Sequence, residues 1–280
     1  MNLQIAINEG GRILKENNID SFQLDSEILM SKVIDKDRKY LILNMKKFIK
    51  KNQFDYFKKL IDQRSKGRPI AYIVGKKEFW KYEFNINSHV LIPRPDSELI
   101  IDQALKVTKN KSKLNILDIG VGSGCILLSI LKDRKTFYGT GIDLSKKCIE
   151  LSKINATKLK LQNRVKLLKT NVDNYKHAKY DLIISNPPYI NKLKLKYLDR
   201  NVINFEPRLA LDGGLDGLSE IRKVILKSSE LIKKNGIFIL EIAFDQKDKV
   251  TKLLRNKGFY INKVLKDLAN NDRCIISTKI

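Results

Sequence analysis

The residues best suited to chemistry in this chain are Asn186-Pro-Pro-Tyr189, which follow a short apolar run, Leu182 to Ile184. Each proline fixes φ at about −65° and lacks an N–H donor, and the residue before a proline is driven into an extended conformation. The apolar run is typical of a buried strand, so we expect a stiff loop at its carboxyl end. Such a loop offers an amide, backbone carbonyls and an aromatic ring, which together suit a planar amino group. A Pro-rich turn without chemistry is the competing interpretation.

A second candidate site is the glycine cluster that follows the apolar stretch of residues 115–119. Gly120, Gly122 and Gly124 allow a tight turn and close approach of a ligand to the backbone at a helix N-terminus. Asp143 ends the next predicted strand, where its carboxylate can bind ribose hydroxyls and repel a 2′-phosphate. This pattern favours an adenosine cofactor with free ribose hydroxyls, a condition that S-adenosylmethionine and NAD both meet. The predicted cofactor-binding residues at this site are Gly120, Val121, Gly122, Ser123, Gly124, Asp143, Asn171 and Val172.

Other polar positions leave alternatives open. Asn171 and Val172 follow the third strand of the predicted sheet, where adenine would lie, but polar residues are common in such loops. Asp118 lies either near the amino-acid tail of the cofactor or beneath the loop, where it would accept hydrogen bonds from backbone N–H groups. Glu206, which precedes a proline, either orders the Pro-Pro loop or is an ordinary surface residue.

The Pro-Pro loop beside an adenosine site indicates methyl transfer to nitrogen. If the Asn186 side-chain oxygen and the Pro187 carbonyl accept from an –NH₂ group, they orient it toward a methyl sulfonium and stabilise positive charge on nitrogen. The methylated nitrogen becomes acidic and releases its proton to water, so no strong base is required. We predict that Asn186, Pro187 and Tyr189 are catalytic, and that Asn186, Pro187, Pro188 and Tyr189 bind substrate.

The elements that must position these sites alternate between strand and helix from Pro93 onward. The pattern predicts an α/β fold whose parallel sheet is covered on both faces. The final two strands lack an intervening helix, so one of them should be antiparallel, at or near the edge. The arrangement resembles the seven-stranded Rossmann-like methyltransferase fold. Strands are expected at residues 113–119, 136–142, 165–169, 180–185, 237–242, 260–265 and 274–278.

The part of the chain before Pro93 has a different pattern. Residues 1 to about 66 carry apolar side chains at helical spacing and predict four helices of a small all-α domain. Residues 79–84 alternate between apolar and polar, which predicts one strand of a β-hairpin, with the return strand at 89–92. The predicted boundaries are therefore 1–75 for the helical domain, 76–92 for the hairpin linker and 93–280 for the methyltransferase domain.

Composition limits the remaining choices. The 280 residues are 42% hydrophobic, enough for real cores, but no apolar run approaches the roughly 18 residues needed to span a bilayer. The N-terminus has no signal-peptide pattern, and the three cysteines form no CxxC pair, so we expect a reduced, cytoplasmic protein without a membrane partner. His89, taken as structural, and His177 are far apart, so we expect no metal site.

The net charge of +24 has two interpretations. A basic protein attracts a polyanion such as RNA. Compositional drift toward lysine gives the same charge without function. We favour drift, because the lysines are spread over the whole chain and arginine is preferred for bidentate phosphate binding. The charge therefore says little about substrate.

Several motifs, taken in order, resemble the bacterial peptide chain release factor glutamine methyltransferases. The resemblance implies that S-adenosylmethionine is the methyl donor and that the acceptor is the side-chain nitrogen of the glutamine in the release factors' Gly-Gly-Gln motif. It also implies that Asn186 contacts the cofactor as well as the substrate. The N-terminal domain is then expected to dock the release factor, and direct nucleic-acid binding is not required. The chain departs from the family at Asn171-Val172, where an acidic and an aromatic residue are frequent, and at Val121, where Thr is usual. The matching stretches are Arg68–Gly75, Val90–Glu98, Asp118–Gly124, Asp143–Ser145, Ser185–Ile190, Glu206–Leu211 and Gly213–Leu218.

Two other functions remain open at this stage. A nucleic-acid amino-methyltransferase, acting on the exocyclic amine of adenine or guanine, shares the Asn-Pro-Pro-Tyr tetrapeptide. A basic RNA-binding protein with a vestigial cofactor fold would explain the charge, but the intact glycine cluster, Asp143 and Pro-Pro loop argue against it.

Overall fold

The computed structural model describes residues 1–176 and 179–280, so His177 lies outside the described residues. The chain forms two compact units. One comprises Met1–Lys76 together with Asp199–Phe205, and the other comprises Lys77–Leu198 together with Glu206–Ile280.

The first unit is helical, which confirms the predicted all-α region. Its buried ion pair joins Arg64 to Asp25 at 2.6 Å. Gly10 lets two helices approach closely, because a Cβ there would lie 2.7 Å from the ring of Phe57. Two short helices were not predicted, and one of them, α9, comes from a segment more than a hundred residues further along the chain. The helices are α1 (Leu3–Glu16), α2 (Phe22–Ile34), α3 (Arg38–Leu43), α4 (Lys51–Ser65), α5 (Ile70–Val74) and α9 (Arg200–Phe205).

The β-hairpin exists, but its strands differ from those predicted. It pairs β1 (Lys76–Phe79) with β2 (Tyr82–Asn85), so the expected strand over residues 79–84 is wrong, and residues 89–92 form no strand. Trp80 turns the chain with a left-handed φ of 58°. Asp133 accepts hydrogen bonds from the Trp80 indole, at 3.0 Å, and from the Tyr82 hydroxyl. This long-range contact holds both aromatic side chains across the turn, whereas the local alternation suggested a continuous strand.

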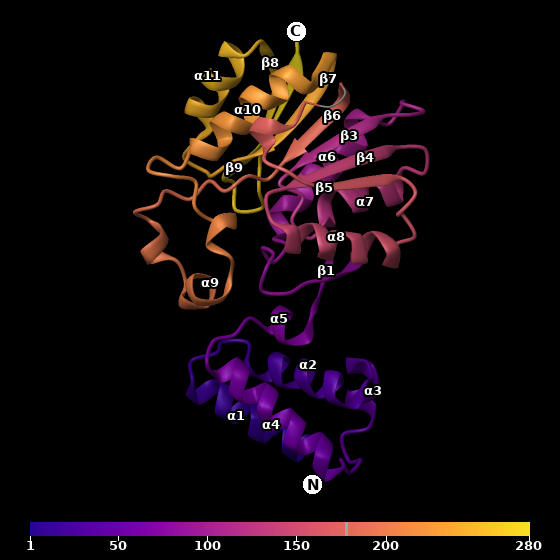
Figure 1. The fold of residues 1–280 in the computed structure, drawn as a ribbon. Helices are drawn as coiled ribbons and strands as arrows, with labels where there is room; N and C mark the ends of the chain where they lie inside the picture. The colour runs from indigo at the N-terminus through magenta and orange to yellow at the C-terminus, as the bar shows by residue number, and fades with distance from the viewer. Residues whose placement is uncertain (177–178) are drawn as a thin grey trace. The chain divides into compact units, whose positions relative to one another are not determined.

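The second unit contains a seven-stranded sheet in the order β5-β4-β3-β6-β7-β9-β8 (Figure 1). The first five strands in this order are parallel, and β9 is antiparallel to both of its neighbours, which confirms the predicted fold class and the predicted antiparallel strand near the edge. The strands are β3 (Asn115–Ile119), β4 (Tyr138–Asp143), β5 (Val165–Lys169), β6 (Tyr180–Ser185), β7 (Ile232–Glu241), β8 (Phe259–Lys266) and β9 (Asp272–Lys279).

Helices cover both faces of this sheet (Figure 1). One core cluster joins the sheet to α6, α7 and α8, and a second joins it to α10 and α11. Successive strand residues point to opposite faces, so on β7 Ile239 faces the first cluster while Phe238 and Leu240 face the second. The helices are α6 (Glu98–Val107), α7 (Cys125–Asp133), α8 (Lys146–Lys158), α10 (Ser219–Leu231) and α11 (Lys247–Asn256), with 3₁₀ turns η1 (Pro95–Ser97), η2 (Val172–Asn174), η3 (Leu195–Tyr197) and η4 (Arg208–Ala210).

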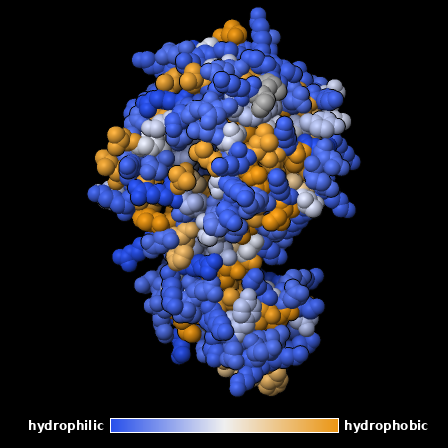
Figure 2. Space-filling model, viewed as in Figure 1, coloured by the Kyte–Doolittle hydropathy of each residue, from blue (hydrophilic) through white to orange (hydrophobic). Residues whose placement is uncertain are grey.

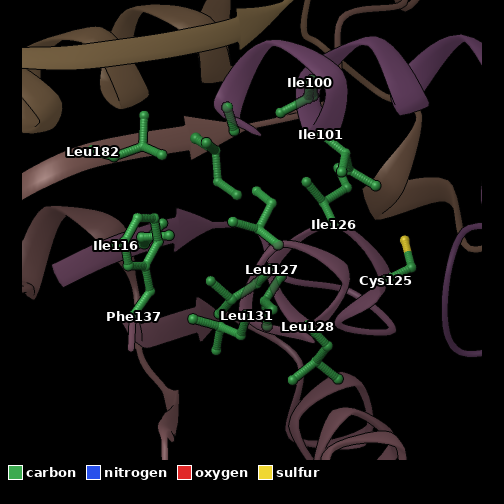
Figure 3. Packing of buried hydrophobic residues seen from close by; sticks show 14 of the residues in the cluster. Ile100, Ile101, Ile116, Cys125, Ile126, Leu127, Leu128, Leu131, Phe137 and Leu182 are labelled. Atoms are coloured by element: carbon green, nitrogen blue, oxygen red, sulfur yellow. The ribbon is translucent and has the colours of Figure 1, made fainter. Parts of the chain in front are cut away.

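Figure 3 shows part of the first cluster, which joins Ile100 and Ile101 of α6 and Leu127 of α7 with Ile116 and Leu182 of the sheet. The surface contrasts with this core: the face drawn in Figure 2 is mostly hydrophilic, with scattered hydrophobic residues. Within residues 1–176 and 179–280, no helix combines the length and the apolar character needed to cross a membrane.

Gly141 of β4 allows the loop after β3 to pack directly on the sheet. An alanine Cβ at this position would lie 2.7 Å from Val121 Cγ2 and 2.9 Å from Leu167 Cδ2. We expect Gly141→Ala to lower the free energy of unfolding by about 1–3 kcal/mol, because a close-packed core resists an added methyl group. Urea denaturation checks this, with the exposed Lys153→Ala on α8 as control. Equal stability of the two variants would contradict the predicted overpacking.

Candidate active site

The glycine loop after β3 has the left-handed backbone conformation that glycine adopts readily. Gly120, Gly122 and Gly124 adopt positive φ values of 83°, 54° and 82°. The carbonyl of Ile142 accepts from the N–H groups of Gly120, at 2.9 Å, and Val121, at 3.0 Å, which ties the loop to β4. A Cβ on Gly120 would meet no atom within 4 Å, so open space adjoins the backbone there. Gly124 differs, because a Cβ would lie 2.8 Å from Leu128, so this glycine serves packing.

Asp143, at the end of β4, has both carboxylate oxygens engaged. Oδ2 accepts from the N–H of Gly122 at 3.0 Å, and Oδ1 accepts from the N–H of Ser145 at 2.8 Å. Burial raises the pKa of Asp143, and these two hydrogen bonds oppose that rise. Each carboxylate oxygen has a second lone pair, so the group retains the capacity to accept from ribose hydroxyls.

Asp118 supports the loop from beneath. The side chain is 2% exposed and does not line the cavity described next. Its carboxyl accepts a hydrogen bond from the backbone of Leu127, in the first turn of α7, and burial raises its pKa to about 8, with the charge of Asp143 adding to the rise. These features favour the turn-holding role over contact with the cofactor.

A cavity of about 470 Å³ lies at the carboxyl ends of the parallel strands. This volume falls within the range of pockets for small molecules. The lining fits S-adenosylmethionine, because exposed glycine backbone, the Asp143 carboxylate and aliphatic side chains adjoin one another. The predicted residues gathered in its wall are Gly120, Val121, Gly122, Ser123, Asp143, Asn171, Val172, Asn186, Pro187 and Pro188. Gly124 and Tyr189 do not line it.

Asn171 and Val172 share this wall but have local contacts as well. The side-chain oxygen of Asn171 accepts from the N–H of Asp173 at 3.0 Å and closes the turn into η2. Val172 packs at the border of the second core cluster. Their predicted contact with adenine stays a prediction.

The Pro-Pro loop leaves β6 in a fixed orientation. Ser185 anchors its start by donating to the carbonyl of Ile119 at 2.7 Å. The Asn186 amide nitrogen donates to the Ser97 hydroxyl at 2.9 Å, and that hydroxyl donates to Glu241 Oε2 at 2.6 Å. The Tyr189 hydroxyl donates to Glu241 Oε1 at 3.2 Å. One buried carboxylate thus contacts both the turn before α6 and the Pro-Pro loop.

Tyr189 lines a second cavity, of about 410 Å³. Gln246 closes this side of the loop by donating to the carbonyls of Tyr189, at 3.1 Å, and Gly217, at 3.0 Å. The exposed side chains of Leu215 and Phe244 and the guanidinium of Arg273 are also in its wall. The Pro-Pro loop therefore has residues facing two cavities, with Asn186 in the first and Tyr189 in the second.

Glu206 is buried, at 7% exposure, and orders a segment other than the Pro-Pro loop. Oε1 accepts from Arg94 Nη2 at 2.5 Å, and Oε2 accepts from the N–H of Ile92 at 3.2 Å. The residue thereby holds the stretch that leads into α6 along the wall of the first cavity. Neither of the two sequence-based alternatives anticipated this contact.

Sequence reasoning missed Ser97, Glu241 and Asn155. Asn155 of α8 donates to the carbonyl of Ser123 at 2.9 Å and to that of Asn85 at 3.0 Å, which joins the hairpin to the glycine loop. A signal for Glu241 existed: like Asp143, it is a carboxylate directly after an apolar strand. No local pattern marks Ser97 or Asn155, since their partners are distant in sequence.

The strand order, with β9 antiparallel between β7 and β8, and the cavity at the strand ends define an S-adenosylmethionine-dependent methyltransferase. Residues 97–215 match the family described as Methyltransferase small domain, and residues 6–75 match the PrmC N-terminal domain. The chain belongs to the release factor glutamine methyltransferase family.

Similar proteins support this placement. The release factor glutamine methyltransferase of Clostridium botulinum is 38% identical over 285 residues, covering 100% of both chains. The bifunctional methyltransferase of Rickettsia felis is 34% identical over 95% of this chain, which spans only 56% of that protein's length. A methyltransferase structure from Pyrococcus furiosus, 18% identical, matches 70% of this chain and 88% of its own with a TM-score of 0.53, and shows the fold alone.

The raised pKa of Asp118 predicts a pH-dependent contribution to stability. An unfolded aspartate titrates at about 3.9, so the neutral folded form stabilises the protein at low pH, and this contribution is lost as pH rises toward about 8. Asp118→Asn remains neutral. We expect the stability of the variant relative to wild type to increase between pH 5 and pH 8 by on the order of 1 kcal/mol or more.

Urea denaturation at both pH values measures this difference. The exposed Asp248→Asn, on α11, is the matched control and should follow the wild-type pH dependence. If the free energies of unfolding of Asp118→Asn and wild type changed in parallel between pH 5 and pH 8, the Asp118 carboxyl would not be neutral in the folded protein at pH 5.

Proposed function

We propose that this protein transfers a methyl group from S-adenosylmethionine to the side-chain amide nitrogen of the glutamine in the Gly-Gly-Gln motif of peptide chain release factors. The observation that carries the proposal is the orientation of Asn186. Its amide nitrogen donates to the Ser97 hydroxyl, so its carbonyl oxygen is directed away from Ser97 and is available to accept from a substrate –NH₂ group. The similarity to full-length release factor glutamine methyltransferases supports a glutamine amide as that group.

The chain's own residues act by positioning and by accepting hydrogen bonds. The Asn186 oxygen and the Pro187 carbonyl accept from the two hydrogens of the amide nitrogen, which fixes its direction and stabilises positive charge as that charge develops on nitrogen. Pro187 and Pro188 keep this loop stiff, because neither has a free φ. When bound, S-adenosylmethionine supplies an activated methyl group, so binding and orientation carry most of the catalysis.

We assign the cofactor to the wall formed by the glycine loop, Asp143, Asn171 and Val172. Asp143 would accept from ribose hydroxyls, and the aliphatic surface of Val172 would contact the adenine. Gly124 supports this site indirectly, through its packing on Leu128. Tyr189 is assigned to the edge of the substrate site, because it lines the cavity on the other side of the loop.

We also propose that residues 1–75 dock the release factor. The match of residues 6–75 to the PrmC N-terminal domain supports this assignment. Hydrogen–deuterium exchange of the full chain with and without a release factor tests it, and we expect protection within 1–75. Protection confined to the catalytic unit would refute the docking role.

A cytoplasmic location is a further proposal. Cys125, Cys148 and Cys274 are free and buried, and unpaired thiols of this kind are typical of a reducing compartment.

Asn186→Ala tests the central assignment. We expect the methylation rate of an unmodified release factor to fall by about 100-fold or more, because a preorganised hydrogen-bonding group at the reacting atom is lost. Mass spectrometry of the Gly-Gly-Gln peptide, with labelled S-adenosylmethionine, measures the product. The matched control is Asn262→Ala, an exposed position on β8, which should retain wild-type activity.

Two results would reject the proposed function. One is an unlabelled release factor with the wild-type enzyme under conditions where the cofactor binds. The other is label that appears on RNA or DNA instead, which would assign the Pro-Pro loop to a nucleobase amine.

A further inference from the structure

Glu241 is a buried carboxylate that neither cavity exposes. It ends β7 on the face that packs against α6, where its side chain is 1% exposed. Its two oxygens contact Ser97, at 2.6 Å, and the Tyr189 hydroxyl, at 3.2 Å. Because Ser97 in turn contacts Asn186, a chain of hydrogen bonds runs from Glu241 through Ser97 to the amide.

The ionisation of Glu241 sets the direction of this Glu241–Ser97–Asn186 chain. An ionised carboxylate can only accept, so Ser97 must give it the single hydroxyl proton. Ser97 then has only lone pairs left for Asn186, and the amide must present its nitrogen to Ser97. The Asn186 oxygen is consequently turned away from Ser97, toward the position proposed for the substrate amino group.

We propose that Glu241 is a positioning residue that keeps the Asn186 carbonyl oxygen directed at the substrate –NH₂ through Ser97, and that the enzyme therefore needs Glu241 ionised. This inference rests on the proposed function and adds a residue that contacts neither substrate nor cofactor. It accounts for the presence of a carboxylate where an apolar residue would otherwise end the strand.

Protonation of Glu241 removes this constraint. A protonated carboxyl is a donor at one oxygen, so one of its two contacts must reverse or break. If Ser97 accepts from Glu241, its own proton is free to point at Asn186, and the amide can turn to accept it. The amide then directs its –NH₂ at the substrate –NH₂, and two donors face each other without a hydrogen bond.

The groups around Glu241 place this change near neutral pH. Burial raises its pKa to about 7, and the charge of Asp96, in the turn before α6, adds to the rise. The hydrogen bonds from Ser97 and Tyr189 and the positive charge of Arg273, on β9, oppose it. Cys274, the next residue on β9, stays neutral in this pH range because burial raises the pKa of its thiol.

Glu241→Gln tests the proposal. Glutamine has the same shape but no charge, so it no longer compels Ser97 to donate. When its –NH₂ end faces Ser97, the hydroxyl accepts there and its proton turns toward Asn186 at every pH. We expect wild-type kcat for release-factor methylation to fall below about pH 7, with a tenfold loss per pH unit at the acid end. The variant should have a kcat lowered by about 10- to 100-fold, no acid limb near pH 7, and unchanged affinity for S-adenosylmethionine by calorimetry.

Two further variants separate positioning from folding. Ser97→Thr retains the hydroxyl and should retain the acid limb near pH 7, whereas Ser97→Ala breaks the chain and should lose that limb, as Glu241→Gln does. Glu230→Gln, at the exposed end of α10, is the matched charge control. A readout independent of activity is the ¹³C signal of the labelled glutamate carboxyl in the free protein, which should titrate near pH 7 and vanish in Glu241→Gln.

Each outcome decides between explanations. If wild type does not methylate the release factor, the proposed function fails before this inference is tested. If wild type is active and Glu241→Gln keeps the same rate and acid limb, the positioning role is wrong. The positioning role would also be wrong if Glu241→Gln were folded by circular dichroism but its affinity for S-adenosylmethionine fell by the same factor as its rate. Glu241 would then act on the cofactor site.

Discussion

A parallel sheet delivers the carboxyl ends of its strands to a single edge, and the catalytic unit depends on this constraint. Because helices cover both faces of the sheet, strand interiors are apolar, and polar side chains gather where the strands end. The glycine loop follows β3, Asp143 ends β4, the Pro-Pro loop follows β6 and Glu241 ends β7. Groups that are far apart in the sequence therefore meet at this edge, where the glycine loop, Asp143 and Asn186 line one cavity.

The carboxylates in this region orient neighbours more than they exchange protons. Asp143 holds the glycine loop by accepting from Gly122, Asp118 holds the first turn of α7, and Glu241 holds Ser97. Burial raises the pKa of all three. The pKa of the exposed Asp216 shifts in the opposite direction, because a hydrogen bond from the Arg222 side chain lowers it to about 2. Burial thus favours the neutral form of a carboxyl group inside the protein, and an ion pair favours its charged form at the surface.

Local signals were sufficient for most of the sheet and for the motifs that line the cavity. Strand alternation with helices, the glycine cluster and the two prolines each depend on neighbours in sequence, so their conformations follow from residue type. The hairpin was misassigned because Asp133, a distant residue, bonds Trp80 and Tyr82 across a turn that local alternation hides. The assignment of α9 to the helical unit is equally non-local, since a separate segment of the chain completes that unit.

The sequence by itself determined the fold class and the stiffness of the Pro-Pro loop, and its resemblance to a family indicated the glutamine substrate that we propose. Only the tertiary structure decided which way that loop faces. Whether Asn186 offers its oxygen or its nitrogen depends on Ser97, and the donor role of Ser97 depends on Glu241. These residues come from three distant parts of the chain. A hydrogen-bond direction is a property of the whole set of partners, so no single stretch of sequence can specify it.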